Sequence, residues 1–334
     1  MTALRMPLYA ALAAGAIGAL GLAASVPGSA PAGAQTYPAK PIKIIVPTSA
    51  GGITDVGARM IGNYISGKTG QPVVIDNRPG GSGNIGMEAT ARAAPDGYTV
   101  GFANTGNIVI NPFLYSHMSF DPLNDLVPVG PVGTVPLFLV TSASQPFKTL
   151  QEFVAYAKAN PDKVNYAGAG AGTTPDLAAD AFARRAGLKL VVVPFKGTTP
   201  AVMGVVGGEV QATFVSMGQH IQLVQNGTLR VLAAATPKRV SYLPDVPTFA
   251  EQGFPGFEAS TWFAMFAPRG TPKEIVDQLN GYVRGVQEDP EAKKRLQAAL
   301  VDPLPMTADE FAALVKSDAA NWEKMVRDSG MKLD

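Results

Sequence analysis

Cysteine is absent from the 334-residue chain, and histidine occurs only as His117 and His220. Without cysteine the chain has no disulfides, thiolate metal sites, cysteine nucleophiles or the lipid-acceptor cysteine of a bacterial lipoprotein. The two histidines lie in different halves with no second histidine at metal-ligand spacing, so the sequence offers few residues for a zinc site or a hydrolytic triad. We therefore predict that each histidine is a surface or packing residue and that no metal is bound.

An excess of either charge is also absent. Lys and Arg number 27 against 26 Asp and Glu, which leaves a net charge of +1. Such a chain has no global basic field to attract nucleic acid or an anionic membrane, so neither is expected as a partner. The share of hydrophobic residues is 46% and that of charged residues 16%, as in a soluble globular protein long enough for two domains.

Long hydrophobic runs are confined to the N-terminus. Arg5 precedes an unbroken apolar run at residues 8–24, and residues 32–34 are small residues ahead of Gln35. This pattern is typical of an export signal, residues 1–34, cleaved near Ala34 and Gln35 to leave a periplasmic protein. The alternative is an uncleaved anchor helix. The weakly hydrophobic Ala and Gly of the run and the prolines that follow it favour the cleaved signal.

Short β-branched runs alternate with helical spacing along most of the remaining chain. Strands are predicted at residues 42–47, 73–75, 98–102, 164–166, 190–193, 212–215 and 231–235. Helices are predicted at residues 54–66, 85–94, 150–159, 175–187, 200–206 and 221–225, followed by three C-terminal helices at 272–286, 290–300 and 307–326. Thr307 and Glu310 fit a capping box for the last of these. The alternation predicts an α/β protein with two doubly wound, mostly parallel lobes and a ligand cleft between them.

Two nucleotide-binding patterns occur in the first half. GNYISGKT, at residues 62–69, matches the phosphate loop, but it ends a predicted helix instead of following a strand. Lys68 then suits a last helical turn, and Gly67 or Gly70 suits a C-cap. GSGNIG, at residues 81–86, does not follow its strand at once, because Asn77 to Gly80 intervene, and it has no acidic partner about 20 residues on. No ATP or NAD cofactor is therefore expected.

Glycine-rich loops join strands to helices at residues 48–52, 81–86, 168–175 and 195–200. Such a loop exposes backbone amides and the positive end of a helix dipole, which suit a carboxylate. Each loop alone is often only a turn, but all four follow strands, where doubly wound folds bind ligands. Together they predict an anion site with Gly51, Ser82, Gly170, Lys196 and Gly197 as candidates. Asp55 is either a ligand-side group or ordinary helix-dipole compensation.

The segments YPAKPIKIIVP, AGGITD, GQPVVIDNRPGGSGNIG, AAPDGYT, LPDVPT and FAPRGTP occur in this order. The chain thereby resembles the Bug-type extracytoplasmic solute receptors, the periplasmic binding proteins of tripartite tricarboxylate transporters, from Tyr37 to its end. The resemblance implies a type II binding-protein fold that closes over a small carboxylate without chemistry and serves membrane permease subunits. We also expect a monomer.

The resemblance implies one lobe of residues 35–139 plus 259–334 and another of residues 140–258. It further assigns ligand binding, through loop amides and ordered waters, to particular positions of this sequence. These are Thr48, Ser49 and Ala50 in the first loop, Thr105 and Asn107 after the third strand, and Thr173 and Thr174 in the second lobe.

The sequence departs from many relatives at three places. Thr48 replaces the aromatic residue of a PFPAGG motif, and Asp176 replaces the histidine of GTSPHL. Val215 and Ser216 follow Phe214 where amino-acid-binding members carry an acidic residue, so an ammonium group would lose its partner. Ser216 is itself a candidate ligand-binding residue. We therefore expect a mono- or dicarboxylate without an amine, aliphatic or aromatic. Asp176 either faces this ligand or is held by nearby backbone amides, and the sequence leaves both open.

Two other functions are compatible with the residues. A receptor of this kind could pass ligand information to a signalling partner. A periplasmic hydrolase would require an activated nucleophile, for which Ser82 or Ser216 with His220 is the best available set.

Overall fold

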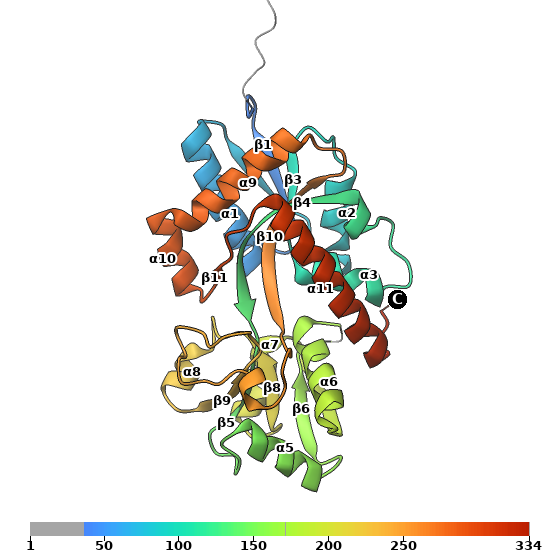
Figure 1. The fold of residues 1–334 in the computed structure, drawn as a ribbon, viewed down its shortest axis with the longest axis vertical. Coiled ribbons are helices and arrows are strands. Elements are labelled where there is room, and N and C mark those ends of the chain that lie inside the picture. The colour runs from blue at the N-terminus through green and yellow to red at the C-terminus, as the bar shows by residue number, and fades with distance from the viewer. Residues whose placement is uncertain (1–36, 171, 334) are drawn as a thin grey trace, which may run out of the picture. The chain divides into compact units, whose positions relative to one another are not determined.

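The computed structural model describes residues 37–170 and 172–333, so the predicted export signal lies outside the described part of the chain. The chain forms two sheets, each covered by helices (Figure 1). The first sheet contains β1 (Ile42–Val46), β2 (Val73–Asn77), β3 (Thr99–Asn104), β4 (Leu126–Pro136), β10 (Ser260–Pro268) and β11 (Asp302–Pro303). Its helical segments are α1 (Ile53–Thr69), η1 (Gly81–Gly83), α2 (Asn84–Ala91), η2 (Gly106–Ile110), α3 (Asn111–Leu114), α4 (Pro122–Asp125), α9 (Lys273–Glu288), α10 (Pro290–Ala298) and α11 (Ala308–Ser329).

The first sheet is mixed, with the strand order β11-β4-β10-β3-β1-β2. Strand β1 pairs in parallel with β2 and β3, whereas β10 is antiparallel to both β3 and β4. The predicted βαβαβ unit is thus present, but the sheet is less parallel than expected. The reason is that β10 enters from the second sheet and not through a helical crossover.

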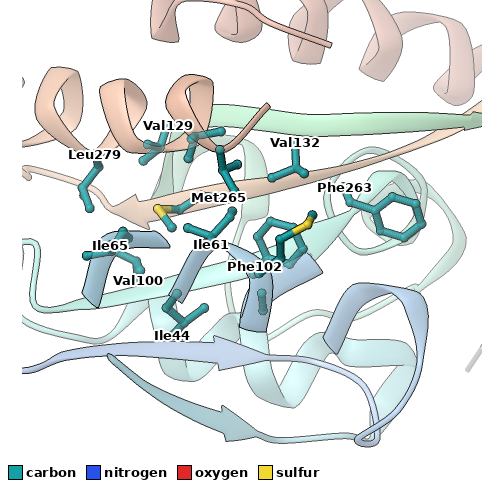
Figure 2. Close-up of a cluster of buried hydrophobic side chains, with 14 of the residues drawn as sticks. Ile44, Ile61, Ile65, Val100, Phe102, Val129, Val132, Phe263, Met265 and Leu279 are labelled. Atoms are coloured by element: carbon teal, nitrogen blue, oxygen red, sulfur yellow. The ribbon is translucent and has the colours of Figure 1, made fainter. Parts of the chain in front are cut away.

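Strand β10 divides the core of this sheet into two faces. Phe263, Met265 and Ala267 pack with α1 and α9, and the alternate residues Trp262 and Phe266 pack with η2 and α11. This alternation is the two-residue period of a strand covered on both faces. Figure 2 shows the first face, where side chains from β1, β3, β4, β10, α1 and α9 gather in one cluster.

The second sheet has the order β7-β6-β8-β5-β9. Its strands are β5 (Phe138–Ser142), β6 (Val164–Gly168), β7 (Leu190–Pro194), β8 (Ala212–Val215) and β9 (Leu229–Ala234). Its helical segments are α5 (Leu150–Ala159), α6 (Thr174–Ala186), α7 (Thr198–Val206), α8 (Ile221–Gln225) and η3 (Ala250–Gln252). Strand β6 is parallel to β7 and β8, and β5 is antiparallel to β8 and β9. Helices α5 and α6 cover one face, and α7 and α8 cover the other.

Two segments connect the sheets. Strand β4 passes into β5 with only Leu137 between them, and the chain returns through Ala259 into β10. The Leu137 amide donates to the Ala259 carbonyl at 3.1 Å, and the Ala259 amide donates to the Ala235 carbonyl at 3.0 Å. Figure 1 shows β4 and β10 side by side along this connection, as their pairing requires. The sheets therefore change at Leu137, two residues before the predicted lobe boundary at 139.

Several local predictions are confirmed. Helix α1 continues through Lys68 in its last turn and ends on Gly70 in the left-handed conformation, so GNYISGKT terminates a helix. Thr307 and Glu310 form the expected capping box of α11. Within the described part of the chain, no helix is both long and apolar enough to cross a membrane.

Candidate functional site

A cavity of about 520 Å³ is lined by loops of both sheets. This volume lies within the usual range of small-molecule sites. Its lining comprises Pro47, Thr48, Ile53, Thr54, Gly80, Ser82, Gly83, Asn104, Gly106, Asn107, Asn111, Gly172, Thr173, Thr174, Pro175, Thr261, Phe263 and Leu333. None of these described residues carries a charge, so an anion in the cavity would be held by hydroxyls, amides and backbone groups.

The loop after β1 is fixed by Asp55, the third residue of α1. The Asp55 carboxylate accepts hydrogen bonds from the Gly51 amide and Arg59 Nε, both at 2.9 Å, and from Asn77 Nδ2 at 3.0 Å. The hydrogen bond from Arg59 is the largest of the effects that lower the Asp55 pKa from 3.8 to about 2. Asn77 Nδ2 also donates to the Thr48 carbonyl at 3.0 Å. Asp55 therefore shapes this wall and is not itself part of the cavity lining.

Thr48 differs from its neighbours because its hydroxyl oxygen is buried and has no hydrogen-bond partner in the described structure. Buried polar groups of this kind are usually satisfied, by protein, water or ligand. Thr48 lines the cavity, so its hydroxyl would be free to donate to a bound group that reaches this buried oxygen.

The glycine turn after β2 forms a second part of the wall. Asn107 Nδ2 donates to the Ser82 carbonyl at 2.8 Å, and Asn111 Nδ2 donates to the same oxygen at 3.1 Å. Ser82 has φ 53°, and the Ser82 hydroxyl lies 2.7 Å from the hydroxyl of Tyr115. Gly83 has φ +90°, and a Cβ there would lie 2.3 Å from Asn107 Nδ2. Two asparagines thus hold a strained turn in which position 83 has space only for glycine.

The second sheet contributes Gly172, Thr173 and Thr174 to the cavity. Behind them, the Asp176 carboxylate accepts hydrogen bonds from the amides of Ala169 at 2.7 Å and Gly170 at 3.3 Å. Burial has the largest effect on the Asp176 pKa and raises it, against the lowering by these hydrogen bonds. Asp176 lines a separate cavity of about 80 Å³, so of the two predicted placements the structure shows the one on backbone amides.

The predicted site residues divide into two groups. Thr48, Ser82, Asn107, Thr173 and Thr174 line the common cavity. The others lie outside this lining: Ser49, Ala50, Gly51, Thr105, Gly170, Asp176, Lys196, Gly197 and Ser216.

Thr105, which lies outside the lining, connects two elements of the first sheet. Its side chain is fully buried, and its hydroxyl accepts a hydrogen bond from the Trp262 amide at 2.9 Å, which joins β10 to the start of η2. The lining residues that the sequence did not indicate include Asn104, Asn111, Thr261, Phe263 and Leu333. They come from β3, α3, β10 and the C-terminal tail, and no local pattern links these segments.

The residues considered for hydrolysis do not assemble. His220 is buried, its two ring nitrogens have no hydrogen-bond partner in the described structure, and burial lowers its pKa. His220 therefore activates neither Ser82 nor Ser216. His117 is exposed. Across residues 37–170 and 172–333, no cluster of three acidic, histidine or cysteine side chains could hold a metal ion.

Residues 57–331 match the family described as tripartite tricarboxylate transporter family receptor, TctC. Protein BugT of Bordetella pertussis is 37% identical over 306 residues, which is 91% of this chain and 94% of BugT. A solved structure of R. palustris Rpa4515 with adipate is 33% identical, with a TM-score of 0.76 over 89% of this chain and 99% of that one. MatC of Rhodopseudomonas palustris, with bound malate, is 30% identical, with a TM-score of 0.72 over 87% and 100%.

The chain therefore belongs to the TctC family of periplasmic solute receptors. Members of this family are substrate-binding receptors of transporters and not enzymes. The two-lobed α/β fold predicted from the sequence is confirmed by these relatives.

Proposed function

We propose that the protein captures a small organic carboxylate, aliphatic or aromatic and without an amine, and delivers it to the permease subunits of a tripartite tricarboxylate-type transporter. The single observation that supports this most is the cavity of about 520 Å³, whose described lining is uncharged but rich in hydroxyl and amide groups. Adipate and malate, carried by two relatives, are carboxylates that such groups can hold.

In this proposal the first lobe comprises residues 35–139 plus 259–334 and the second residues 140–258. One carboxylate oxygen would take the unsatisfied Thr48 hydroxyl as its donor, with amides of residues 48–50 and of the Ser82 turn beside it. Closure would then add the hydroxyls of Thr173 and Thr174. Only a ligand that contacts both lobes gains affinity from the closed state, so binding and closure are coupled.

We further propose that the export signal is cleaved near Ala34 and Gln35 and that the mature receptor is a periplasmic monomer without a cofactor. The absence of any acidic residue in the described lining supports a ligand without an ammonium group. A signalling partner that reads the closed state is the second candidate, because the same closure would serve it.

A thermal-shift screen of the purified protein tests this function. Carboxylates, amino acids and nucleotides would each be added at increasing concentration. A ligand at 100 times its dissociation constant stabilises the fold by about 2.7 kcal/mol. We expect stabilisation by carboxylates alone, and stabilisation only by amino acids or nucleotides would contradict the proposal.

A further inference from the structure

A small apolar cavity adjoins the carboxylate cavity. It has a volume of about 30 Å³, enough for about two water-sized groups. Ile53 and Phe263 line both cavities, so these two side chains separate them. The rest of the small cavity is lined by apolar residues of α1, α10, β3 and β4, such as Val56 and Val132, and by Arg295. Figure 2 shows Phe263, Phe102 and Val132 in this part of the core cluster.

Two of the side chains that line this apolar side pocket are large, hydrophobic and exposed. Ile53 is 40% exposed and Val56 47% exposed, although both belong to α1, whose other face is packed into the core. Arg295 is the charged residue of the lining, and its Nε lies 3.4 Å from Glu291 Oε1 in an exposed ion pair. The guanidinium charge is thus already paired, and the arginine stem can add apolar surface to the pocket.

The part of the carboxylate cavity that the second sheet contributes has a negative charge behind it. The Asp176 carboxylate is held by the amides of Ala169 and Gly170, and Thr173, whose hydroxyl donates to the Gly170 carbonyl at 2.8 Å, lines the cavity beside it. In the described part of the chain no cationic side chain pairs with Asp176. A second carboxylate at this wall would therefore meet a like charge without compensation.

We infer that the ligand is a monocarboxylate whose uncharged end is apolar and lies in the side pocket between Ile53 and Phe263. This inference rests on the proposed function and narrows its substrate class. The apolar side pocket favours a hydrocarbon end, and the charge of Asp176 disfavours a second carboxylate at the other wall. These two observations are independent and lead to the same ligand chemistry.

Hexanoate and adipate provide the direct test, because they have equal chain length and differ only in the second carboxylate. Titration calorimetry of the purified protein with each should show hexanoate binding at least tenfold tighter. Adipate binding as tightly as hexanoate, or tighter, would overturn the inference and leave the proposed function in place. If neither these two acids nor any acid of a C2–C10 and benzoate series binds, the inference and the proposed function both fail.

Two variants test the two walls separately. Val56→Asn should weaken hexanoate about fivefold and leave acetate unchanged, because acetate has no chain to reach the side pocket. Val74→Asn is the matched control, since Val74 is 51% exposed on β2 and lines neither cavity. Asp176→Asn should tighten adipate about fivefold with little effect on hexanoate, and Asp180→Asn, in an exposed pair with Arg184, should change neither. Equal responses of each variant and its control would overturn the inference.

Discussion

Each lobe contains an aspartate that accepts hydrogen bonds from a glycine-rich loop, but the charge of this aspartate is compensated by an arginine in the first lobe alone. In each, the third residue of a helix is an aspartate that accepts hydrogen bonds from amides of the glycine-rich loop before it, Asp55 for residues 48–52 and Asp176 for residues 168–172. Asp55 also accepts from Arg59 and Asn77, so its charge is compensated and its pKa is low. Asp176 accepts from the backbone amides of Ala169 and Gly170 and has no cation beside it in the described structure, and burial raises its pKa.

The Asp55 carboxylate holds its loop in shape without adding an uncompensated charge. The Asp176 carboxylate holds its loop and also places a negative charge near the cavity. Both carboxylates occupy amides that a ligand could otherwise use, so each lobe presents the remaining groups of its loop. In the first lobe the charge is neutralised, and the nearby Thr48 hydroxyl is left without a partner. In the second lobe the charge persists behind Thr173. A carboxylate should therefore prefer the first lobe.

Removing the Asp55 carboxylate should produce the largest effect. Asp55→Ala leaves the Gly51 amide and Arg59 Nε without this acceptor and removes one of the two hydrogen bonds of Asn77 Nδ2, and we expect a loss of about 2–3 kcal/mol in the free energy of unfolding. Urea unfolding measures this loss. Asp76→Ala is the control, because its pair with Arg78 is partly exposed and is worth less than about 1 kcal/mol. Equal losses would show that Asp55 is not a central contact of the loop.

The pH dependence of stability should have opposite signs at the two aspartates. Asp55 has a lowered pKa in the fold, so its contribution is present above the unfolded value of 3.8 and is lost as the pH falls to about 2. Asp176 has a raised pKa, so its burial destabilises the fold above that pKa, and this cost is relieved as the pH falls through it.

Chemical unfolding of the protein and of Asp55→Asn and Asp176→Asn between pH 2 and pH 7 measures both contributions. The advantage of the unchanged protein over Asp55→Asn should shrink by about 2 kcal/mol as the pH falls from about 4 to about 2. Relative to Asp176→Asn, the unchanged protein should instead gain stability on acidification. Parallel curves for the two variants would refute the electrostatic difference between the lobes.

The smallest effects should come from the threonine hydroxyls. Thr48→Val removes an unpartnered hydroxyl, so stability should stay within about 0.5 kcal/mol while carboxylate affinity falls about tenfold. Thr173→Val removes the hydrogen bond from its hydroxyl to the Gly170 carbonyl, 2.8 Å long, and should cost about 1 kcal/mol of stability. Calorimetry and urea unfolding of both variants separate the two roles. A stability loss in Thr48→Val equal to that in Thr173→Val would contradict them.

The sequence predicted the alternating strands and helices well because each has local periodicity. Strand β4 was missed because its segment LVPVGPVGTVP contains three prolines and two glycines, which normally interrupt strands. Strand β10 was missed because STWFAMFAP is covered on both faces and so lacks polar alternation. These two strands carry the connection between the sheets, so the lobe boundaries were set by resemblance alone.

The candidate site was predicted only in part, because only some of its residues lie in loops with a recognisable local pattern. Loops at the ends of strands are recognisable from glycine and hydroxyl residues, and Thr48, Ser82 and Thr173 do line the cavity. Phe263 and Leu333 come from a strand and a tail far away in sequence, and only tertiary packing brings them to the cavity. The orientation of Asp176 depended on two backbone amides, which no sequence pattern reveals.

A crystal structure of the protein with the tightest-binding acid of the carboxylate series would show which lobe holds the carboxylate. We predict a carboxylate oxygen within about 3.2 Å of Thr48 Oγ1. Asp176 should keep its hydrogen bonds to the amides of Ala169 and Gly170. A carboxylate that instead displaces Asp176 and binds those two amides would contradict the account, because the second lobe would then be the primary anion site.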